Sequence, residues 1–176
     1  AQQEMSIFVE VGDGGGKGQA DQVVFDVGSG VTTNYSAMGI SFGRMNKIFL
    51  NHLHGDHMGD LAHIYCFGPA FDRKSPLYVW GSGPSGVRSP RPPRRLYDDG
   101  TRAFCRNLRE ACRWHSESFS FLSTAYAEQD LPTRESWGLP CDPVPVGDDP
   151  RGDGYALVPI ELDWTRVGGV AYDNKA

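Results

Sequence analysis

Long apolar stretches are absent from this chain of 176 residues. A helix that crosses a bilayer needs about 20 consecutive apolar residues, and no segment comes near that length. The first four residues, Ala1 to Glu4, also lack the basic and then apolar stretch of a secretory signal peptide. We therefore expect a soluble protein that is cytoplasmic or, after processing, periplasmic or secreted.

Cysteine is scarce, and its spacing does not match a zinc knuckle. The four cysteines are Cys66, Cys105, Cys112 and Cys141. Cys105 and Cys112 lie on one face of a predicted helix, about 10 Å apart along its axis, which is too far for a disulfide between them. An even count permits other disulfides, so the sequence leaves the redox state and the compartment open.

A net positive charge is absent as well. The formal charge of −5 gives no overall attraction to nucleic acid. Locally, however, residues 88–113 contain eight arginines against three acidic residues. One interpretation is the solvated face of a helix over Thr101–Trp114. The other is a site for an anionic substrate, a phosphate or RNA, because the guanidinium fork matches phosphate oxygens.

What remains is an ordinary globular composition, with 39% hydrophobic and 22% charged residues. The length suits one domain over residues 1–176. Glycine and proline are frequent, and residues 115–154 have a composition rich in Ser, Pro, Asp and Gly. We expect that segment to be a long loop or an insertion.

Strand and helix patterns alternate along the chain. Strand patterns cover residues 6–11, 22–27, 47–50, 76–80, 155–162 and 167–173. The first two enclose a glycine-rich turn and predict a β-hairpin, and Pro159 marks its segment as an edge strand. Helices are expected from near Asp56, over residues 58–67 and over residues 101–114, while residues 31–45 form a short helix or a loop.

The candidate metal-binding residues follow the third predicted strand. Three of the five histidines lie within six residues, together with an aspartate: His52, His54, Asp56 and His57. They stand at the carboxyl end of the predicted strand 47–50, where the chain turns into a helix. Ligands usually bind at this edge in α/β folds.

The spacing predicts convergence. His52 and His54 are two residues apart, so on an extended segment both side chains point the same way. Gly55 permits a sharp turn, after which Asp56 and His57 can face the same point. Imidazole and carboxylate groups suit zinc, and also iron or manganese. Four potential ligands in six residues therefore predict a metal site.

Two carboxylates allow a structural interpretation too. Asp56, together with Asn51, could cap the following helix. Asp26 ends the strand 22–27 just before Gly28, where its side chain could cap a turn. Alternatively, Asp26 could orient a metal-binding histidine by hydrogen bonding to its other ring nitrogen.

The segments Val24–Gly30 and Asn51–His57 together resemble the metallo-β-lactamase superfamily, whose metal motif is H-x-H-x-D-H. The sequence His-Leu-His-Gly-Asp-His is most similar to the tRNase Z and arylsulfatase-like branch. Residues Pro76–Gly86, a strand followed by a Gly-Pro-rich turn, resemble the same branch. The resemblance covers roughly residues 6–86.

The resemblance implies a four-layer αββα sandwich with two metal ions between its sheets, zinc in the first instance. His52 and His54 would bind the first ion, and Asp56 and His57 would bind the second. Asp26 would orient a metal-binding histidine without contacting the metal itself. A water made acidic by the metals would be the nucleophile, and Asp56 would also handle its proton. The implied reaction is hydrolysis of a phosphodiester, a sulfate ester or a related ester or amide.

The family completes its site with a histidine, a bridging aspartate and a final histidine from its C-terminal half. After His57 this chain has only His63 and His115. We expect His63 to pack or to lie on the surface, and His115 to cap a helix end as a cation or to replace a missing ligand. The expected fold is therefore α+β and incomplete: the N-terminal half of the sandwich, one sheet with its helices.

An incomplete sandwich leaves one apolar sheet face uncovered, and such a face must find a partner. We expect self-association, or association with a missing C-terminal half. Three functions follow from the sequence: a metal-dependent hydrolase, a truncated metal-binding member without turnover, and an anion- or nucleic-acid-binding module built on Arg88–Arg113, which the overall charge does not favour.

Overall fold

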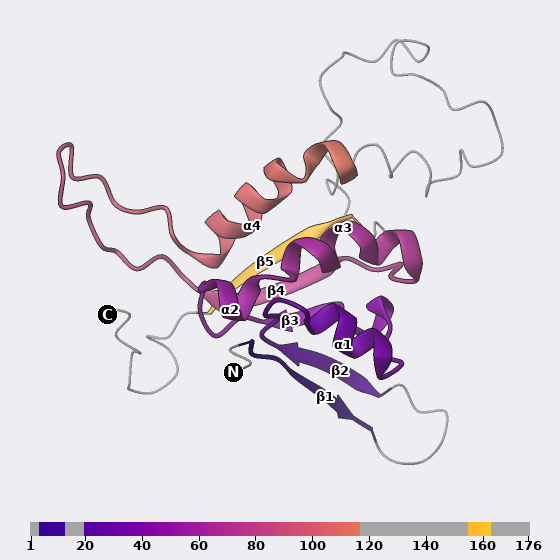
Figure 1. Cartoon of the computed structure of the whole chain (residues 1–176). Coiled ribbons are helices and arrows are strands. Elements are labelled where there is room, and N and C mark those ends of the chain that lie inside the picture. The colour runs from indigo at the N-terminus through magenta and orange to yellow at the C-terminus, as the bar shows by residue number, and fades with distance from the viewer. Residues whose placement is uncertain (1–3, 13–19, 117–154, 163–176) are drawn as a thin grey trace, which may run out of the picture.

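The computed structural model describes residues 4–12, 20–116 and 155–162. Its strands are β1 Ile7–Val11, β2 Asp21–Phe25, β3 Lys47–Phe49, β4 Leu77–Ser82 and β5 Leu157–Leu162. Its helices are α1 Val31–Ala37, the 3-10 helix η1 Phe42–Arg44, α2 Gly55–Met58, α3 Leu61–Phe71 and α4 Thr101–Ala111. The strands form one sheet in the order β1-β2-β3-β4-β5 (Figure 1). The expected sheet with its helices is confirmed over these residues.

The sheet is mixed. The predicted hairpin is confirmed, because β1 and β2 are antiparallel, with Ile7 opposite Phe25. From β2 to β5 each neighbouring pair is parallel. Parallel pairing brings the carboxyl ends of β2, β3 and β4 to the same edge of the sheet. β5 lies at the other end of the strand order, as Pro159 predicted for an edge strand.

One face of the sheet carries the core. The strand register aligns a row of apolar residues on this face: Phe8, Val24, Ile48, Val79 and Pro159. Val24, Ile48 and Val79 are fully buried. The helices add further buried residues to the same cluster: Leu61, Ile64, Tyr65 and Cys105. Each large apolar side chain buried in this way stabilises the fold by about 1.5–3 kcal/mol.

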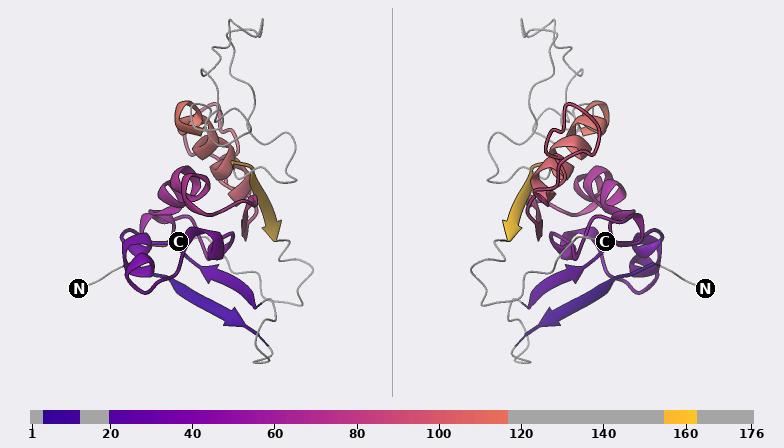
Figure 2. Two further views of the ribbon diagram at one scale, coloured as in Figure 1. Left: turned by 90° about the vertical axis from the view of Figure 1, so that its right-hand side faces the viewer. Right: turned by 90° about the vertical axis from the view of Figure 1, so that its left-hand side faces the viewer.

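The helices lie on one side of the sheet, as the edge-on views of Figure 2 show. The helix predicted over residues 58–67 is divided in two, since α2 ends at Met58 and α3 begins at Leu61. The division falls at Gly59, where an added Cβ would lie 2.4 Å from Ser29 Oγ. The loop after β2 therefore presses against the chain between the two helices, a tertiary contact that periodicity does not reveal.

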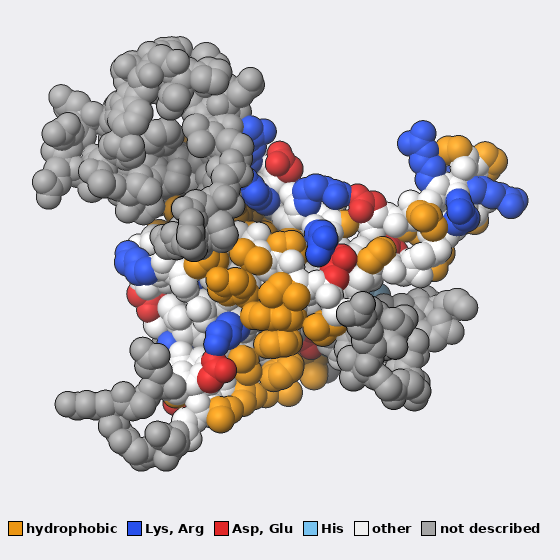
Figure 3. All heavy atoms as spheres, turned by 180° about the vertical axis from the view of Figure 1, so that it is seen from behind, with side chains coloured by type: hydrophobic (Ala, Val, Ile, Leu, Met, Phe, Trp, Pro, Cys, Tyr) orange, Lys and Arg blue, Asp and Glu red, His pale blue; other side chains and the backbone are white. Residues whose placement is uncertain are grey.

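The other face of the sheet is apolar and open. Here the register aligns Ile7, Phe25, Phe49, Trp80 and Ile160 across the five strands. The ring of Phe49 stacks on those of Phe25 and Trp80, with centroid distances of 5.3 Å and 4.6 Å. Figure 3 shows this face from behind, with a continuous band of apolar side chains. We call this row the aromatic row.

Some predictions fall outside the described residues. The strand expected over residues 167–173 lies there entirely, and so does the loop 115–154 apart from His115 and Ser116. Within the described ranges, no helix is both long and apolar enough to cross a membrane. Cys66, Cys105 and Cys112 are free thiols, and Cys141 lies outside the described residues.

Candidate metal centre

The four candidate ligands lie where the chain leaves the sheet after β3. Leu50 N donates to Trp80 O at 2.7 Å, so the chain stays extended one residue beyond the strand. His52 follows on this segment, and His54 is the residue before α2, with φ −84° and ψ 154°. Asp56 and His57 are in α2 itself. An extended segment followed by a tight helical turn thus brings three of the four side chains, His52, His54 and Asp56, together and places His57 next to them.

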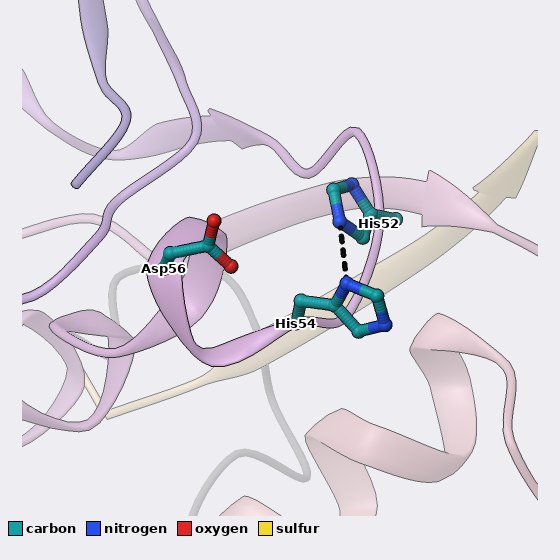
Figure 4. A group of neighbouring side chains, drawn as sticks. All are labelled: His52, His54 and Asp56. Carbon is teal, nitrogen blue, oxygen red and sulfur yellow. Dashed lines mark hydrogen bonds between the residues drawn. The ribbon is translucent and has the colours of Figure 1, made fainter. Parts of the chain in front are cut away.

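The side chains converge as the spacing predicted. His52 Nε2 and His54 Nδ1 are 3.0 Å apart. Figure 4 marks this contact with a dashed line. One potential ligand atom each from His52, His54 and Asp56 lies within 4.8 Å of the others. His57 lies beside this group but is not part of it: its Nε2 is 3.6 Å from Asp56 Oδ2 and its ring centroid is 4.0 Å from that of His52.

Asp26 fixes the orientation of the His57 ring through a hydrogen bond. His57 Nδ1–H donates to Asp26 Oδ2 at 2.8 Å, and the two side chains are only 11% and 10% exposed. The other carboxylate oxygen of Asp26 accepts from Asn51 N, also at 2.8 Å. With its proton on Nδ1, the neutral ring of His57 presents the Nε2 lone pair on the side of Asp56.

The backbone of Asp26 is unusual, with φ 59°. Aspartate is one of the few residues other than glycine that adopts this left-handed conformation readily. The turn lets one carboxylate reach both Asn51 and His57. Asp26 therefore combines the two roles considered from the sequence. Its carboxylate fixes a turn, and it also hydrogen-bonds to a candidate metal ligand.

Asp60 is a further residue that supports the site, and the sequence analysis assigned it no role. Its carboxylate accepts from Gly30 N at 3.1 Å, from Thr32 N at 2.8 Å and from Thr32 Oγ1 at 2.8 Å. These bonds satisfy backbone donors at the start of α1. They also tie the loop after β2 to the segment that carries the candidate ligands. The sequence shows an aspartate shortly after the histidine cluster. Its role could not be predicted from that position, because its hydrogen-bond partners lie about 30 residues earlier in the chain.

The same loop packs closely on α2. Val27 N donates to His57 O at 2.7 Å, and Asp60 N donates to Val27 O at 2.9 Å. At Gly28 an added Cβ would lie 2.3 Å from Asp56 O. Only glycine permits this approach, which holds Asp56 and His57 against the rigid end of β2.

The local electrostatics favour neutral imidazole. Burial lowers the pKa of His52, and the neighbouring rings of His57 and His54 lower that pKa further. Asp26 and Asp56 act in the opposite direction with a smaller effect. The neutral ring is the form that coordinates a metal ion.

These residues fit a divalent metal ion. A tetrahedral zinc ion with Zn–N distances of about 2.0–2.1 Å holds two imidazole nitrogens about 3.4 Å apart. The observed 3.0 Å between His52 Nε2 and His54 Nδ1 is within a small side-chain rotation of that value. Nitrogen and carboxylate donors suit zinc, iron or manganese, so the group is consistent with metal binding without naming the ion.

The two later histidines are engaged elsewhere. The ring of His63 stacks on Phe42 at a centroid distance of 5.9 Å and packs at a tilt against Phe67 at 4.8 Å, in agreement with the expected packing role. His115 Nε2 lies 2.9 Å from Cys66 O in α3. Among the described residues, the group of potential ligands includes neither of them.

Comparisons with known proteins find partial matches. The chain is 38% identical to ribonuclease Z of Pyrococcus furiosus over 64 residues, which is 36% of this chain and 21% of that protein. It is 35% identical to ribonuclease BN of Citrobacter koseri over 72 residues, 40% of this chain and 22% of that protein. The crystal structure of human tRNase Z, short form, matches with 28% identity and a TM-score of 0.34, covering 44% of this chain and 27% of that one. No family model matches the chain.

The similarity is partial. The matched segment spans about a fifth of the length of these curated relatives. Within that limit, the chain is similar to ribonuclease Z and ribonuclease BN of the metallo-β-lactamase superfamily, and it carries the HxHxD group of potential ligands. The resemblance inferred from the motif is confirmed at this level.

Proposed function

We propose that this chain provides one side of a dinuclear metal site in a metal-dependent hydrolase, with zinc as the metal. The observation that carries the proposal is the convergence of His52, His54 and Asp56 within 4.8 Å, with His57 held beside them by Asp26. Iron and manganese suit the same donors and are the alternatives. One or two ions are compatible with four protein ligands when water completes the coordination.

Each side chain has a separate role in this proposal. His52 and His54 hold the first ion, and Asp56 and His57 hold the second. Such ions, when bound, polarise the scissile ester and make water acidic enough to attack near neutral pH. Asp56, whose side chain is 44% exposed and so accessible to water, would also take the proton of the attacking water. Asp26 keeps the Nδ1 proton of His57 in place and so keeps Nε2 available.

A phosphodiester is the proposed substrate. The sequence motif alone is equally consistent with a sulfate ester or a related ester or amide. The relatives in the comparisons are named ribonucleases, and a ribonuclease cleaves the phosphodiester bonds of RNA. This favours RNA, or a small phosphodiester that resembles its backbone, over the other esters.

The open sheet face bears on how the site is completed. Ile7 and Phe25 in the aromatic row are 56% and 43% exposed. In the purified chain the partner for this face is a second copy, because each copy presents the same apolar row. Lys47 and Asp21 form an ion pair beside the row. In a two-fold dimer, Lys47 of each copy can therefore also pair with Asp21 of the other copy. Where a C-terminal half is present, it competes for this face.

The test of activity uses the purified chain with added zinc. Its substrates are bis(p-nitrophenyl) phosphate, p-nitrophenyl sulfate and a chromogenic β-lactam. The expected result is slow, zinc-dependent release of nitrophenolate from the phosphodiester alone, lost on addition of EDTA. Turnover of the sulfate or the lactam in preference would overturn the substrate proposal.

The second candidate function is metal binding without turnover. It is favoured by one observation, that the described residues bring together four candidate ligands from one segment and none from elsewhere in the chain. Stoichiometric zinc with no hydrolysis of any of the three substrates would establish this function in place of the first.

A further inference from the structure

A projecting hairpin connects β4 to α4. We call residues 87–97 the arginine arm, and Figure 1 shows it extending away from the sheet and helices. Two pairs of hydrogen-bonding residues define it as a hairpin: Tyr97 N donates to Val87 O and Ser89 N donates to Arg95 O, both at 2.9 Å. Arg88 and Leu96 form an antiparallel bridge between its two sides. The arm therefore has a defined backbone and is more than an extended linker.

Its base is fixed to the body of the protein. Ser85 N donates to Asp99 Oδ1 at 2.9 Å, and the Ser85 hydroxyl donates to the other oxygen of the same carboxylate. Gly100, just after the arm, is buried, and an added Cβ there would lie 2.5 Å from Glu161 Oε1. The arm therefore projects from an anchored base, and its position relative to the sheet is set.

Four arginines line this arm: Arg88, Arg91, Arg94 and Arg95. All four are exposed. Within the part of the chain that the structure describes, no ion pair joins any of them to a carboxylate. By contrast, three of the four arginines of the following segment form ion pairs: Arg102 with Glu161, Arg106 with Asp98 and Arg113 with Glu110. The positive charge of residues 88–113 is thus mostly paired with carboxylates over residues 102–113 and unpaired along the arm.

The tip of the arm has a strained residue that is itself an arginine. Arg94 adopts φ 50°, a left-handed conformation that is strained for a residue other than glycine. The turn is closed by Arg94 N, which donates to Arg91 O at 2.9 Å. Glycine or asparagine would suit this position better. An arginine held there against its backbone preference points to a role for its side chain.

The arm also lies at the same edge of the sheet as the candidate metal centre. His52 follows the carboxyl end of β3, and the arm follows the carboxyl end of β4. The two strands are parallel neighbours, with Phe49 opposite Trp80. The base of the arm is therefore at the sheet edge where His52, His54 and Asp56 converge.

We propose that the arginine arm binds the phosphodiester backbone of a nucleic-acid strand. Several guanidinium groups along one projecting hairpin match a polymer with regularly spaced phosphates better than a single phosphate ion. The exposed ring of Tyr97, 47% accessible, gives a base a surface on which to stack. A membrane surface fits less well, since the tip residues Arg91 to Arg94 include no bulky apolar anchor. This binding uses no metal. As a contact to an RNA substrate it deepens the proposed function and in that respect rests on it, whereas the binding itself is tested without hydrolysis.

The experiment measures binding of fluorescein-labelled oligouridylate and oligothymidylate of about 20 nucleotides by anisotropy, in EDTA so that no metal contributes. Four phosphate contacts predict a slope of about −3 for log K against log salt, or about 50-fold weaker binding between 50 and 200 mM salt. The triple variant Arg91→Gln, Arg94→Gln, Arg95→Gln should reduce the slope to about −1, and the same salt change should then weaken binding only about 3-fold. RNA and DNA compared side by side show whether the 2′-hydroxyl contributes.

A matched control removes the same charge from α4. The variant Arg102→Gln, Arg106→Gln, Arg113→Gln should keep a slope near −3, because these arginines are already paired. The single variant Arg94→Gly relieves the backbone strain and should weaken binding while leaving the thermal midpoint unchanged or higher. Equal loss in both triple variants, or stronger binding to phosphatidylserine vesicles than to either oligonucleotide, would overturn the proposal.

Discussion

The Nδ1 of His57 lies 2.8 Å from the Oδ2 of Asp26, a residue 31 positions earlier in the chain. Both side chains are about nine-tenths buried. This bond joins the end of β2 to α2 and sets which nitrogen of His57 faces Asp56. The first prediction follows from it.

Replacement of Asp26 by Asn should weaken zinc binding about 10- to 100-fold, the usual effect of losing a carboxylate behind a metal-binding histidine. Asparagine also accepts the left-handed backbone of this position, so the fold should be retained. The measurement is competition with a chromophoric zinc chelator. Asp21→Asn serves as the control, since Asp21 is exposed and pairs with Lys47 away from the cluster. Equal affinity in the two variants would remove Asp26 from the site.

The open sheet face gives a second prediction. Replacement of Trp80 by Ser should remove the central contact of the aromatic row, where Trp80 stacks on Phe49 at 4.6 Å. We expect light scattering after size exclusion to give twice the 19.3 kDa chain mass for the native protein and a mass nearer one chain for the variant.

The matched control for that change is Trp114→Ser, on the helical side of the molecule, where Trp114 is 81% exposed. It should leave the mass unchanged. A native protein that runs as a well-folded monomer would contradict the partner proposal.

A third prediction concerns the thiol of Cys105, which is 1% exposed. Burial, and to a smaller extent the charge of Glu161, raises its pKa to about 12. Only the thiolate reacts with iodoacetamide, so the reaction should be slow at pH 8 and its rate should still rise between pH 9 and 10. A variant with serine at Cys66, Cys112 and Cys141 isolates this thiol.

The reference is the same variant unfolded in urea. Its thiol pKa is near 9, so its rate should level off as the pH passes that value. Because the folded protein holds the proton more tightly than the unfolded one, Cys105 stabilises the fold below pH 9 and this contribution falls as the pH rises toward 12. A plateau near pH 9 in the folded protein would show that Cys105 is not buried as described.

The sequence predicted the elements that depend on local pattern. The alternation of residues 6–11 and 22–27 gave the hairpin, and the short apolar run before Asn51 gave β3. The ligand cluster was predictable for the same reason, since its geometry follows from a spacing of two residues and a glycine turn.

Features that depend on distant partners were not predictable. The three hydrogen bonds of Asp60 and the close approach at Gly28 join segments about 30 residues apart. The sequence marked residues 88–113 as rich in arginine but did not predict the hairpin of the arginine arm. Its hairpin depends on cross-strand bonds such as that from Ser89 N to Arg95 O.

The most direct measurement is the metal content of the purified chain by inductively coupled plasma mass spectrometry, after zinc loading and desalting. Native protein should retain one or two zinc ions per chain, and the double variant His52→Ala, His54→Ala should lose at least one of them. His63→Ala is the control, because His63 packs against Phe42 and Phe67 and should not affect zinc content. Unchanged zinc stoichiometry in the double variant would contradict the assignment of this segment as a metal site.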